Sequence, residues 1–146
     1  KYGIPQDFKY IPLVESGLTT NLYSPRGAAG LWQFMPQTGR DFGLKVNGEI
    51  DERFNIKLST VAAAKYFKSL YKIFGNWTLV AAAYNGGEGR IKKQMRTQKQ
   101  ANYFKLKLNR ETAKYVYSII SMKEIIEHPE TYGYKISNPR LLAYQR

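Results

Sequence analysis

Helical periodicity is the feature that most limits what this chain can fold into. Between residues 58 and 74, apolar side chains recur three or four positions apart and lysines occupy the opposite side, which is typical of an amphipathic helix. Gly75 follows at the position where such a helix commonly ends. No segment shows the alternation of apolar and polar residues that marks a strand. The sequence therefore predicts an all-α domain.

A second long helix is predicted to begin at Asn109, a suitable N-cap, and to stop before Pro129. Glu111 favours its first turn. Because its polar stripe is narrow, we expect this helix to be well buried. Pro12 should kink or divide an earlier, shorter helix. The shorter helices are predicted at residues 6–15, 36–42, 77–84 and 87–95.

The chain has the size and composition of one domain. Its 146 residues, 43% of them apolar, can bury a core without metals or disulfides. No apolar run approaches the roughly eighteen residues that span a bilayer. Because the chain begins at Lys1 with no signal-like stretch, we expect it to be an excerpt of a longer protein. The tail after Tyr134 could be extended, docked or partly disordered.

Basic residues outnumber acidic ones in this chain. Lysine and arginine number 23 against 11 acids, a formal net charge of +12, which would steer the domain towards polyanions. Nucleic acid, an anionic membrane surface and a cell wall bearing peptide carboxylates all fit this charge, as does a plain solubilising surface. Many basic residues fall between Arg90 and Lys114, where a solvated helical face is favoured over a dedicated binding patch.

The residue content argues against several kinds of site. There is no cysteine, and the single histidine, His128, precedes a proline, so neither a zinc site nor a histidine-based triad is expected. The glycine-rich stretch at residues 85–90 lacks the lysine and the serine or threonine of a phosphate-binding loop. We therefore expect no metal and no cofactor.

Glu15 is a candidate acid because of its place in the chain. It follows an apolar run and precedes Gly17, so it should lie near the C-terminal end of a helix at the edge of the core. Burial and the negative end of a helix dipole both favour a protonated carboxyl group. Position alone nevertheless favours a glutamate whose stem packs while its carboxylate reaches water. Only the surrounding sequence reverses that preference.

Four short blocks of sequence carry a resemblance to a known family. In chain order they are Glu15-Ser16, then Gly30-Leu31-Trp32-Gln33 followed by Met35-Pro36 and Thr38, then Ala83-Tyr84-Asn85, and last Glu111-Thr112 with Tyr115. In this order the blocks resemble the family 1 lytic transglycosylases, the SLT domain of glycoside hydrolase family 23. Trp32 departs from the methionine that is common at its position, a change that bears on local substrate contacts and not on the reaction.

The resemblance implies a fold and a reaction. The fold is lysozyme-like and helical, and residues 1–146 would form a single catalytic domain excised from a longer secreted or lipid-anchored protein. The substrate is the glycan strand of peptidoglycan, cleaved at the β-1,4 bond between N-acetylmuramic acid and N-acetylglucosamine. Glu15 would protonate the leaving oxygen. As a carboxylate, it would then take the proton from the C6 hydroxyl that attacks C1 and closes a 1,6-anhydro ring.

One glutamate is enough for such a reaction, whereas ordinary glycosidases need two carboxyl groups. The matched blocks offer no obvious second carboxylate. Four other acids are expected to form helix-end or loop salt bridges, namely Asp41, Asp51, Glu52 and Glu88.

The resemblance also assigns five substrate-binding residues. These are Ser24, Gln33, Tyr84, Asn85 and Tyr115. Their polar groups can bond acetamido and hydroxyl groups, and a tyrosine hydroxyl can orient Glu15 or the sugar. Ordinary core packing is the alternative role for the two tyrosines.

Three other functions are weighed against this hypothesis. A hydrolase of the same fold, like goose-type lysozyme, would need a carboxylate placed to activate water. A glycan-binding module that has lost catalysis is disfavoured by the intact Glu15, and a nucleic-acid binder rests on charge alone. We expect peptidoglycan strands as the partner, no nucleic acid, membrane contact only through an anchor outside this segment, and a monomer. The expected location is the bacterial periplasm or cell envelope, and anchoring to the outer membrane is one form that this location could take.

Overall fold

The computed structural model describes residues 3–135, and this part of the chain is helical, with isolated bridges and no strand. The all-α prediction is therefore confirmed. Nearly all of the tail after Tyr134 lies outside the described residues. In chain order, the α-helices and the 3-10 helices (η) are η1 (Gln6–Tyr10), α1 (Ile11–Ser16), α2 (Pro36–Asp41), η2 (Glu52–Phe54), α3 (Ile56–Phe74), α4 (Trp77–Gly86), α5 (Glu88–Gln98), η3 (Tyr103–Lys105), α6 (Arg110–Glu127) and η4 (Pro129–Tyr132).

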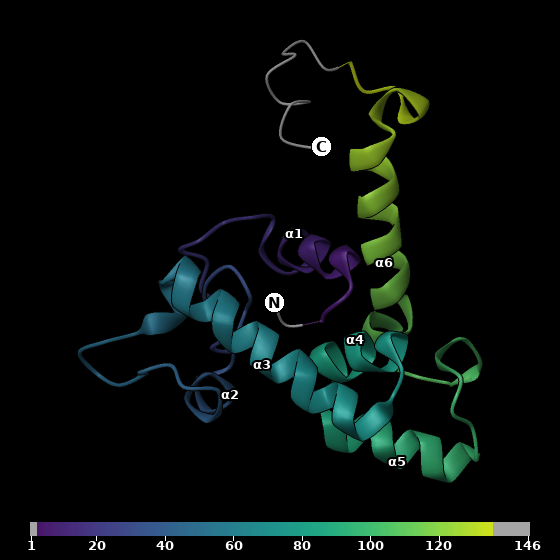
Figure 1. Cartoon of the computed structure of the whole chain (residues 1–146), viewed down its shortest axis with the longest axis horizontal. Helices are drawn as coiled ribbons and strands as arrows, with labels where there is room; N and C mark the ends of the chain where they lie inside the picture. Colours follow the sequence, from purple (N-terminus) through teal and green to yellow (C-terminus); the bar gives the residue numbers. More distant parts are fainter. Residues whose placement is uncertain (1–2, 136–146) are drawn as a thin grey trace.

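Helix α4 forms the centre of the fold. It packs against α3, α5 and α6, which meet around it (Figure 1). The five residues from Leu79 to Ala83 are all buried, as expected for a helix that is apolar on every side. Three of the five are alanines, whose small side chains leave room for the neighbouring helices.

Helix α3 begins and ends close to where the sequence predicts. The side chain of Asn55 caps its first turn by accepting a hydrogen bond from the amide of Leu58 at 3.0 Å. Gly75 ends the helix in the left-handed conformation, with φ 61°. Phe67 lies on the buried stripe of α3 and packs edge to face against Phe8, with ring centroids 4.9 Å apart.

Helix α6 is capped by Asn109 as predicted, because the Asn109 side chain accepts a hydrogen bond from the amide of Thr112 at 2.9 Å. The prediction that α6 is well buried is wrong. Only four of its 18 residues are buried, namely Thr112, Tyr115, Val116 and Ile119, while Tyr117 and Ile120 are 53% and 46% exposed. The C-terminal end of α6 extends past the other α-helices (Figure 1), and α6 also contacts the 3-10 helices η1 and η4.

The predicted first helix is divided near Pro12. The chain forms 3-10 turns in η1 and becomes α-helical in α1, where Pro12 occupies the first turn. Proline is tolerated there because the amide it lacks would have no partner within the helix. Gly17 ends α1 with φ 58°, so Glu15 lies in the last turn of a short helix.

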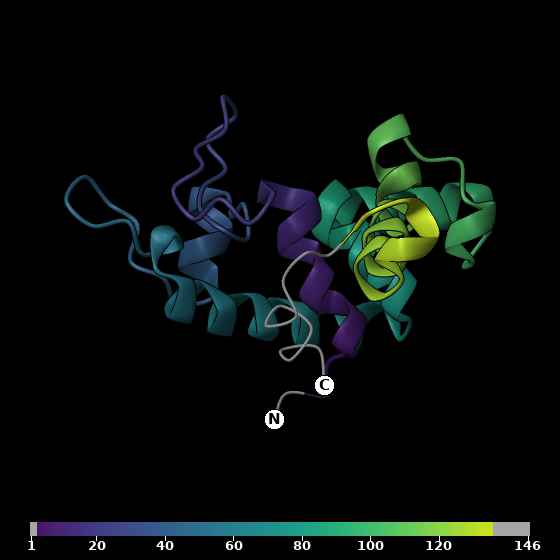
Figure 2. The ribbon, with the colours of Figure 1, turned by 90° about the horizontal axis from the view of Figure 1, so that it is seen from above.

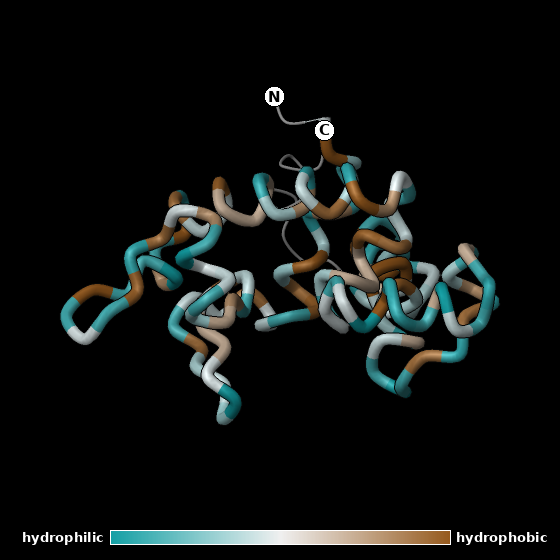
Figure 3. Tube along the Cα trace, turned by 90° about the horizontal axis from the view of Figure 1, so that it is seen from below, coloured by the Kyte–Doolittle hydropathy of each residue, from teal (hydrophilic) through white to brown (hydrophobic). Residues whose placement is uncertain are grey.

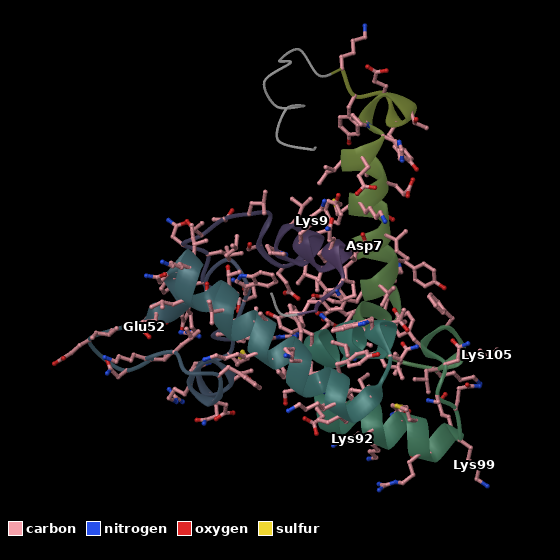
Figure 4. The ribbon with its side chains drawn as sticks, viewed as in Figure 1. Asp7, Lys9, Glu52, Lys92, Lys99 and Lys105 are labelled. Atoms are coloured by element: carbon pink, nitrogen blue, oxygen red, sulfur yellow. The ribbon has the colours of Figure 1, made fainter. Side chains whose placement is uncertain are left out.

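The outer surface carries much of the charge. Figure 3 shows hydrophobic stretches in the interior of the helical body, and along its outer edges hydrophilic residues with some hydrophobic stretches among them. The side chains of Lys92, Lys99 and Lys105 are exposed and point outward from α5 and the segment after it (Figure 4). This is the arrangement expected of a solvated face. None of the helices in residues 3–135 is long and apolar enough to cross a membrane.

Candidate active site

Glu15 lies in the last turn of α1, partly buried at the side of a cleft. Burial is the main influence on its proton affinity and raises the pKa of Glu15 from 4.5 to about 7. A hydrogen bond from Tyr115 opposes this rise, and the nearby charge of Glu111 adds to it. A carboxyl group with this pKa is protonated in a large fraction of molecules near neutral pH, so it can act as a general acid.

Tyr115 holds the Glu15 carboxyl group from behind. It lies on the buried stripe of α6, and its hydroxyl donates to Oε1 of Glu15 at 2.5 Å. Burial raises the pKa of Tyr115 well above its usual range. The hydroxyl therefore remains protonated at neutral pH, and as a donor it fixes the direction in which the carboxyl group points.

The cleft beside Glu15 has a volume of about 500 Å³. All six α-helices contribute to it, together with the long segment between α1 and α2, which rises on one side of α3 (Figure 2). Five of the six predicted site residues line it, and Tyr115 does not. Its lining consists of Glu15, Ser24, Arg26, Ala28, Gln33, Phe34, Met35, Thr38, Tyr66, Tyr84, Asn85, Gly86, Gly87, Arg90 and Glu111.

Ser24 and Gln33 are positioned by backbone contacts within the segment between α1 and α2. The hydroxyl oxygen of Ser24 accepts from the amide of Ala28 at 2.9 Å. Gln33 has a left-handed backbone with φ 49°, and its side-chain nitrogen donates to the carbonyl oxygens of Gly30 and Leu22 at 2.8 and 3.3 Å. With its nitrogen so engaged, the Gln33 amide oxygen is the group left to meet a ligand.

Arg53 holds this segment in place from within. It is buried, and its Nη1 donates to the carbonyl oxygens of Gly27 and Phe34 at 2.7 and 2.9 Å. Asp51 pairs with its Nη2 at 2.6 Å. Gly30 lies directly against the Arg53 carbonyl, at φ 74°, where a Cβ atom would collide with it. The wall that carries Ser24 and Gln33 thus depends on the buried Arg53 side chain, which Asp51 pairs with.

Tyr84 is both a core residue and a cleft residue, so the two roles weighed for it do not exclude each other. Its ring packs against those of Phe67 and Tyr66, with centroids 4.8 and 5.4 Å away. Its hydroxyl donates to the carbonyl oxygen of Trp32 at 2.7 Å. This bond ties α4 to the segment that carries Gln33.

Asn85 connects α4 to the first turn of α6. Its side-chain nitrogen donates to Oε1 of Glu111 at 2.9 Å, and its oxygen accepts from the hydroxyl of Thr112 at 2.9 Å. Both ends of the amide are therefore engaged within the protein, and Asn85 orients Glu111 at the cleft.

Glu111 was not predicted as a cleft residue. No second carboxylate was expected from the matched blocks, and the structure corrects this, since Glu111 belongs to the last block and lines the cleft. Its place in the first turn of α6 had suggested only a helix-end role. The available signal was its spacing from Tyr115, because residues four apart share one face of a helix. Arg26, Tyr66 and Arg90 also line the cleft and carried no signal in the sequence.

Two of the four other acids, Asp51 and Glu88, form the predicted salt bridges, whereas in the described residues Glu52 and Asp41 accept hydrogen bonds from uncharged groups. Asp51 pairs with Arg53, and Glu88 pairs with Lys92 at 2.5 Å. Glu52 accepts from the amide of Lys45 at 2.7 Å, and Asp41 accepts from the Gln37 side chain at 2.8 Å. None of these four lines the described cleft.

The fold and the site together define a class of protein. The domain is helical, and at the side of its open cleft lies a carboxyl group whose pKa is close to neutral pH and which a buried tyrosine orients. This is the acid–base arrangement of lysozyme-like glycan-cleaving enzymes. The Transglycosylase SLT domain family matches residues 1–107, and the chain belongs to this family. The predicted family is thereby confirmed.

Known relatives agree with this assignment. The chain is 36% identical over 141 residues to membrane-bound lytic murein transglycosylase D of Escherichia coli K12, a match that covers 93% of this chain and 31% of the relative. The chain thus spans about a third of that relative's length.

Solved structures show the same fold. The 70 kDa soluble lytic transglycosylase of Escherichia coli superimposes with a TM-score of 0.68 at 25% identity, over 82% of this chain and 21% of that one. The lytic transglycosylase Slt of Pseudomonas aeruginosa, solved as an inactive mutant, gives a TM-score of 0.63 at 25% identity, over 85% and 22% of the two chains. The predicted lysozyme-like SLT fold is confirmed.

Proposed function

We propose that this chain is the catalytic domain of a peptidoglycan lytic transglycosylase. Its substrate would be the β-1,4 bond between N-acetylmuramic acid and N-acetylglucosamine, and its product a strand ending in 1,6-anhydro-N-acetylmuramic acid. Residues 1–146 would act as one domain of a longer, secreted or lipid-anchored protein in the bacterial cell envelope. The single observation that carries the proposal is the Glu15 carboxyl group, with its pKa near 7, at the cleft.

Glu15 would serve as acid and then as base. In the first step its proton passes to the glycosidic oxygen, the bond from that oxygen to C1 of muramic acid breaks, and N-acetylglucosamine leaves. In the second step the muramic acid C6 oxygen bonds to C1, and its proton returns to Glu15. The reaction consumes no water and restores the protonated acid.

The surrounding residues fit this chemistry. Tyr115 would orient Glu15 without touching the sugar, because it lies behind the carboxyl group. Ser24 and Gln33 would bind polar groups of the substrate from the opposite wall, while Tyr84 and Asn85 would shape the cleft floor. A similar enzyme from Pseudomonas aeruginosa is described as inactive when one glutamate is replaced by glutamine, which supports an essential glutamate in the proposed reaction.

A hydrolase is the second candidate, and Glu111 is the observation that favours it. A second carboxylate in the cleft could activate water, as in inverting glycosidases. The Glu111 carboxylate is also held in a fixed orientation, because it accepts a hydrogen bond from Asn85.

Product mass distinguishes the two reactions. Purified peptidoglycan is digested with the wild-type protein, and the soluble fragments are measured by mass spectrometry. We expect anhydro products, which are one water lighter than hydrolysed ones. Hydrolysed fragments would replace the proposal with the hydrolase, and binding to cell walls without any fragments would replace it with a non-catalytic glycan-binding module.

A further inference from the structure

A second, smaller hollow lies beside the cleft that contains Glu15. Its volume is about 200 Å³, and it is formed by α5, the segment leading into α6 and the first turn of α6. Arg90 lines both hollows, so the two adjoin. This hollow has no part in the proposed reaction.

Arg90 and Lys107 give the hollow a positive charge. Both side chains are exposed, and within residues 3–135 the ion pairs involve three other cations, namely Arg53, Lys92 and Lys123. The residues that line the hollow include no acid. Two cations with no carboxylate of their own favour an anionic ligand at this place.

Apolar side chains and hydrogen bonds with Gln98 give the hollow a fixed shape. Ile91, which is fully buried, and Leu108 give it an apolar part. The Gln98 side chain accepts from the amide of Lys107 at 2.8 Å and donates to its carbonyl oxygen at 2.9 Å. These two bonds hold the backbone of Lys107 against α5, so its charge is presented on a fixed support.

We propose that this hollow binds a carboxylate of the stem peptide that peptidoglycan carries on each muramic acid. The inference rests on the proposed function, because it places the glycan in the adjoining cleft. The stem peptide leaves the sugar through a lactyl group, so it emerges next to the cleft. The carboxylates of the stem peptide match Arg90 and Lys107, and its short aliphatic side chains match the apolar part formed by Ile91 and Leu108. The guanidinium of Arg90 can donate two parallel hydrogen bonds to a carboxylate.

Substrates with and without stem peptides test the inference. Turnover by the wild type, Lys107→Gln and the double variant Arg90→Gln/Lys107→Gln is measured on intact glycan strands and on strands stripped of peptide by an amidase. The readout is the ratio of kcat/KM on intact strands to kcat/KM on stripped strands. Lys93→Gln is the matched control, because Lys93 is exposed on α5 and lines neither hollow.

We expect this ratio to fall on the order of two- to five-fold in Lys107→Gln and further in the double variant, through a higher KM. Lys93→Gln should keep the wild-type ratio. An unchanged ratio in the double variant, or an equal fall in the control, would overturn the inference. If the wild type turns over neither substrate, the proposed function itself fails, and that outcome is distinct from the other two.

Discussion

The phenolic oxygen of Tyr115 lies 2.5 Å from Oε1 of Glu15, although 100 positions of sequence separate the two residues. The bond joins the buried stripe of α6 to the last turn of α1. Because Glu15 is partly buried and Glu111 lies nearby, its carboxyl group would hold its proton even more strongly without this bond. Tyr115 therefore keeps the pKa of Glu15 in the range where the same group can release a proton and take it back.

Replacing Tyr115 with phenylalanine should raise the pKa of Glu15 above about 7, since the hydrogen bond that lowers it is lost. The alkaline limb of the pH–activity profile should move to higher pH, and kcat should fall by about ten- to a hundred-fold because the carboxyl group is no longer oriented. Tyr103→Phe is the control, since its hydroxyl bonds the carbonyl oxygens of Thr112 and Ala113 instead. A limb that stays in place in Tyr115→Phe, or moves to lower pH, would contradict the role given to this bond.

Stability should depend on pH through Glu15. Its pKa is raised from 4.5 to about 7 on folding, so between these values the folded protein binds a proton that the unfolded chain has released. The free energy of unfolding should therefore fall as pH rises from about 4.5 to 7, by about 3 kcal/mol from this group. Urea denaturation of the wild type and Glu15→Gln measures this. The variant should be the more stable protein at about pH 8, and a difference that does not change with pH would refute the shift.

Glu111→Gln should lower the pKa of Glu15, because a neighbouring negative charge is removed. The alkaline limb of activity should move to lower pH, the opposite direction from Tyr115→Phe. Anhydro products should persist, since Glu15 needs no second carboxylate for the proposed reaction. Complete loss of turnover in a folded Glu111→Gln protein would instead assign Glu111 a direct part in catalysis.

The substitution Gly30→Ala tests whether the wall of the cleft needs the close contact between Gly30 and the Arg53 carbonyl. Alanine there would meet the carbonyl of Arg53 and would be held at a positive φ, so the free energy of unfolding should fall by about 3 kcal/mol or more. Gly48→Ala is the control, because nothing lies within 4 Å of its Cβ position. Thermal melts of the two variants decide the point, and equal melting temperatures would show that the wall does not need glycine at position 30.

Local pattern predicts the helices well in this chain. The spacing of apolar residues in α3, the caps at Asn109 and Gly75, and the break near Pro12 all act over a few residues, so they can be seen in the sequence. The exposed apolar residues of α6 could not be predicted in this way. Ile120 is apolar but 46% exposed, and which face of α6 is covered depends on the arrangement of the whole fold.

The site was predictable only in part, for a similar reason. Glu15 was identified by its flanking sequence, and its burial followed from the apolar run before it. The contact between Glu15 and Tyr115 and the place of Glu111 in the cleft depend on how α6 crosses α1. Arg90 lay among many basic residues of similar appearance, and only the structure separates it from the solvated lysines of α5.

Turnover of purified peptidoglycan by Glu15→Gln tests the central claim most directly, with Glu49→Gln as the control because Glu49 is an exposed loop residue. Glutamine nearly matches the shape of glutamate and cannot donate the proton. With folding verified by circular dichroism, we predict a loss on the order of 10² to 10⁴ in rate for Glu15→Gln and none for Glu49→Gln. If Glu15→Gln keeps most of the wild-type rate, the acid–base role of Glu15 is contradicted.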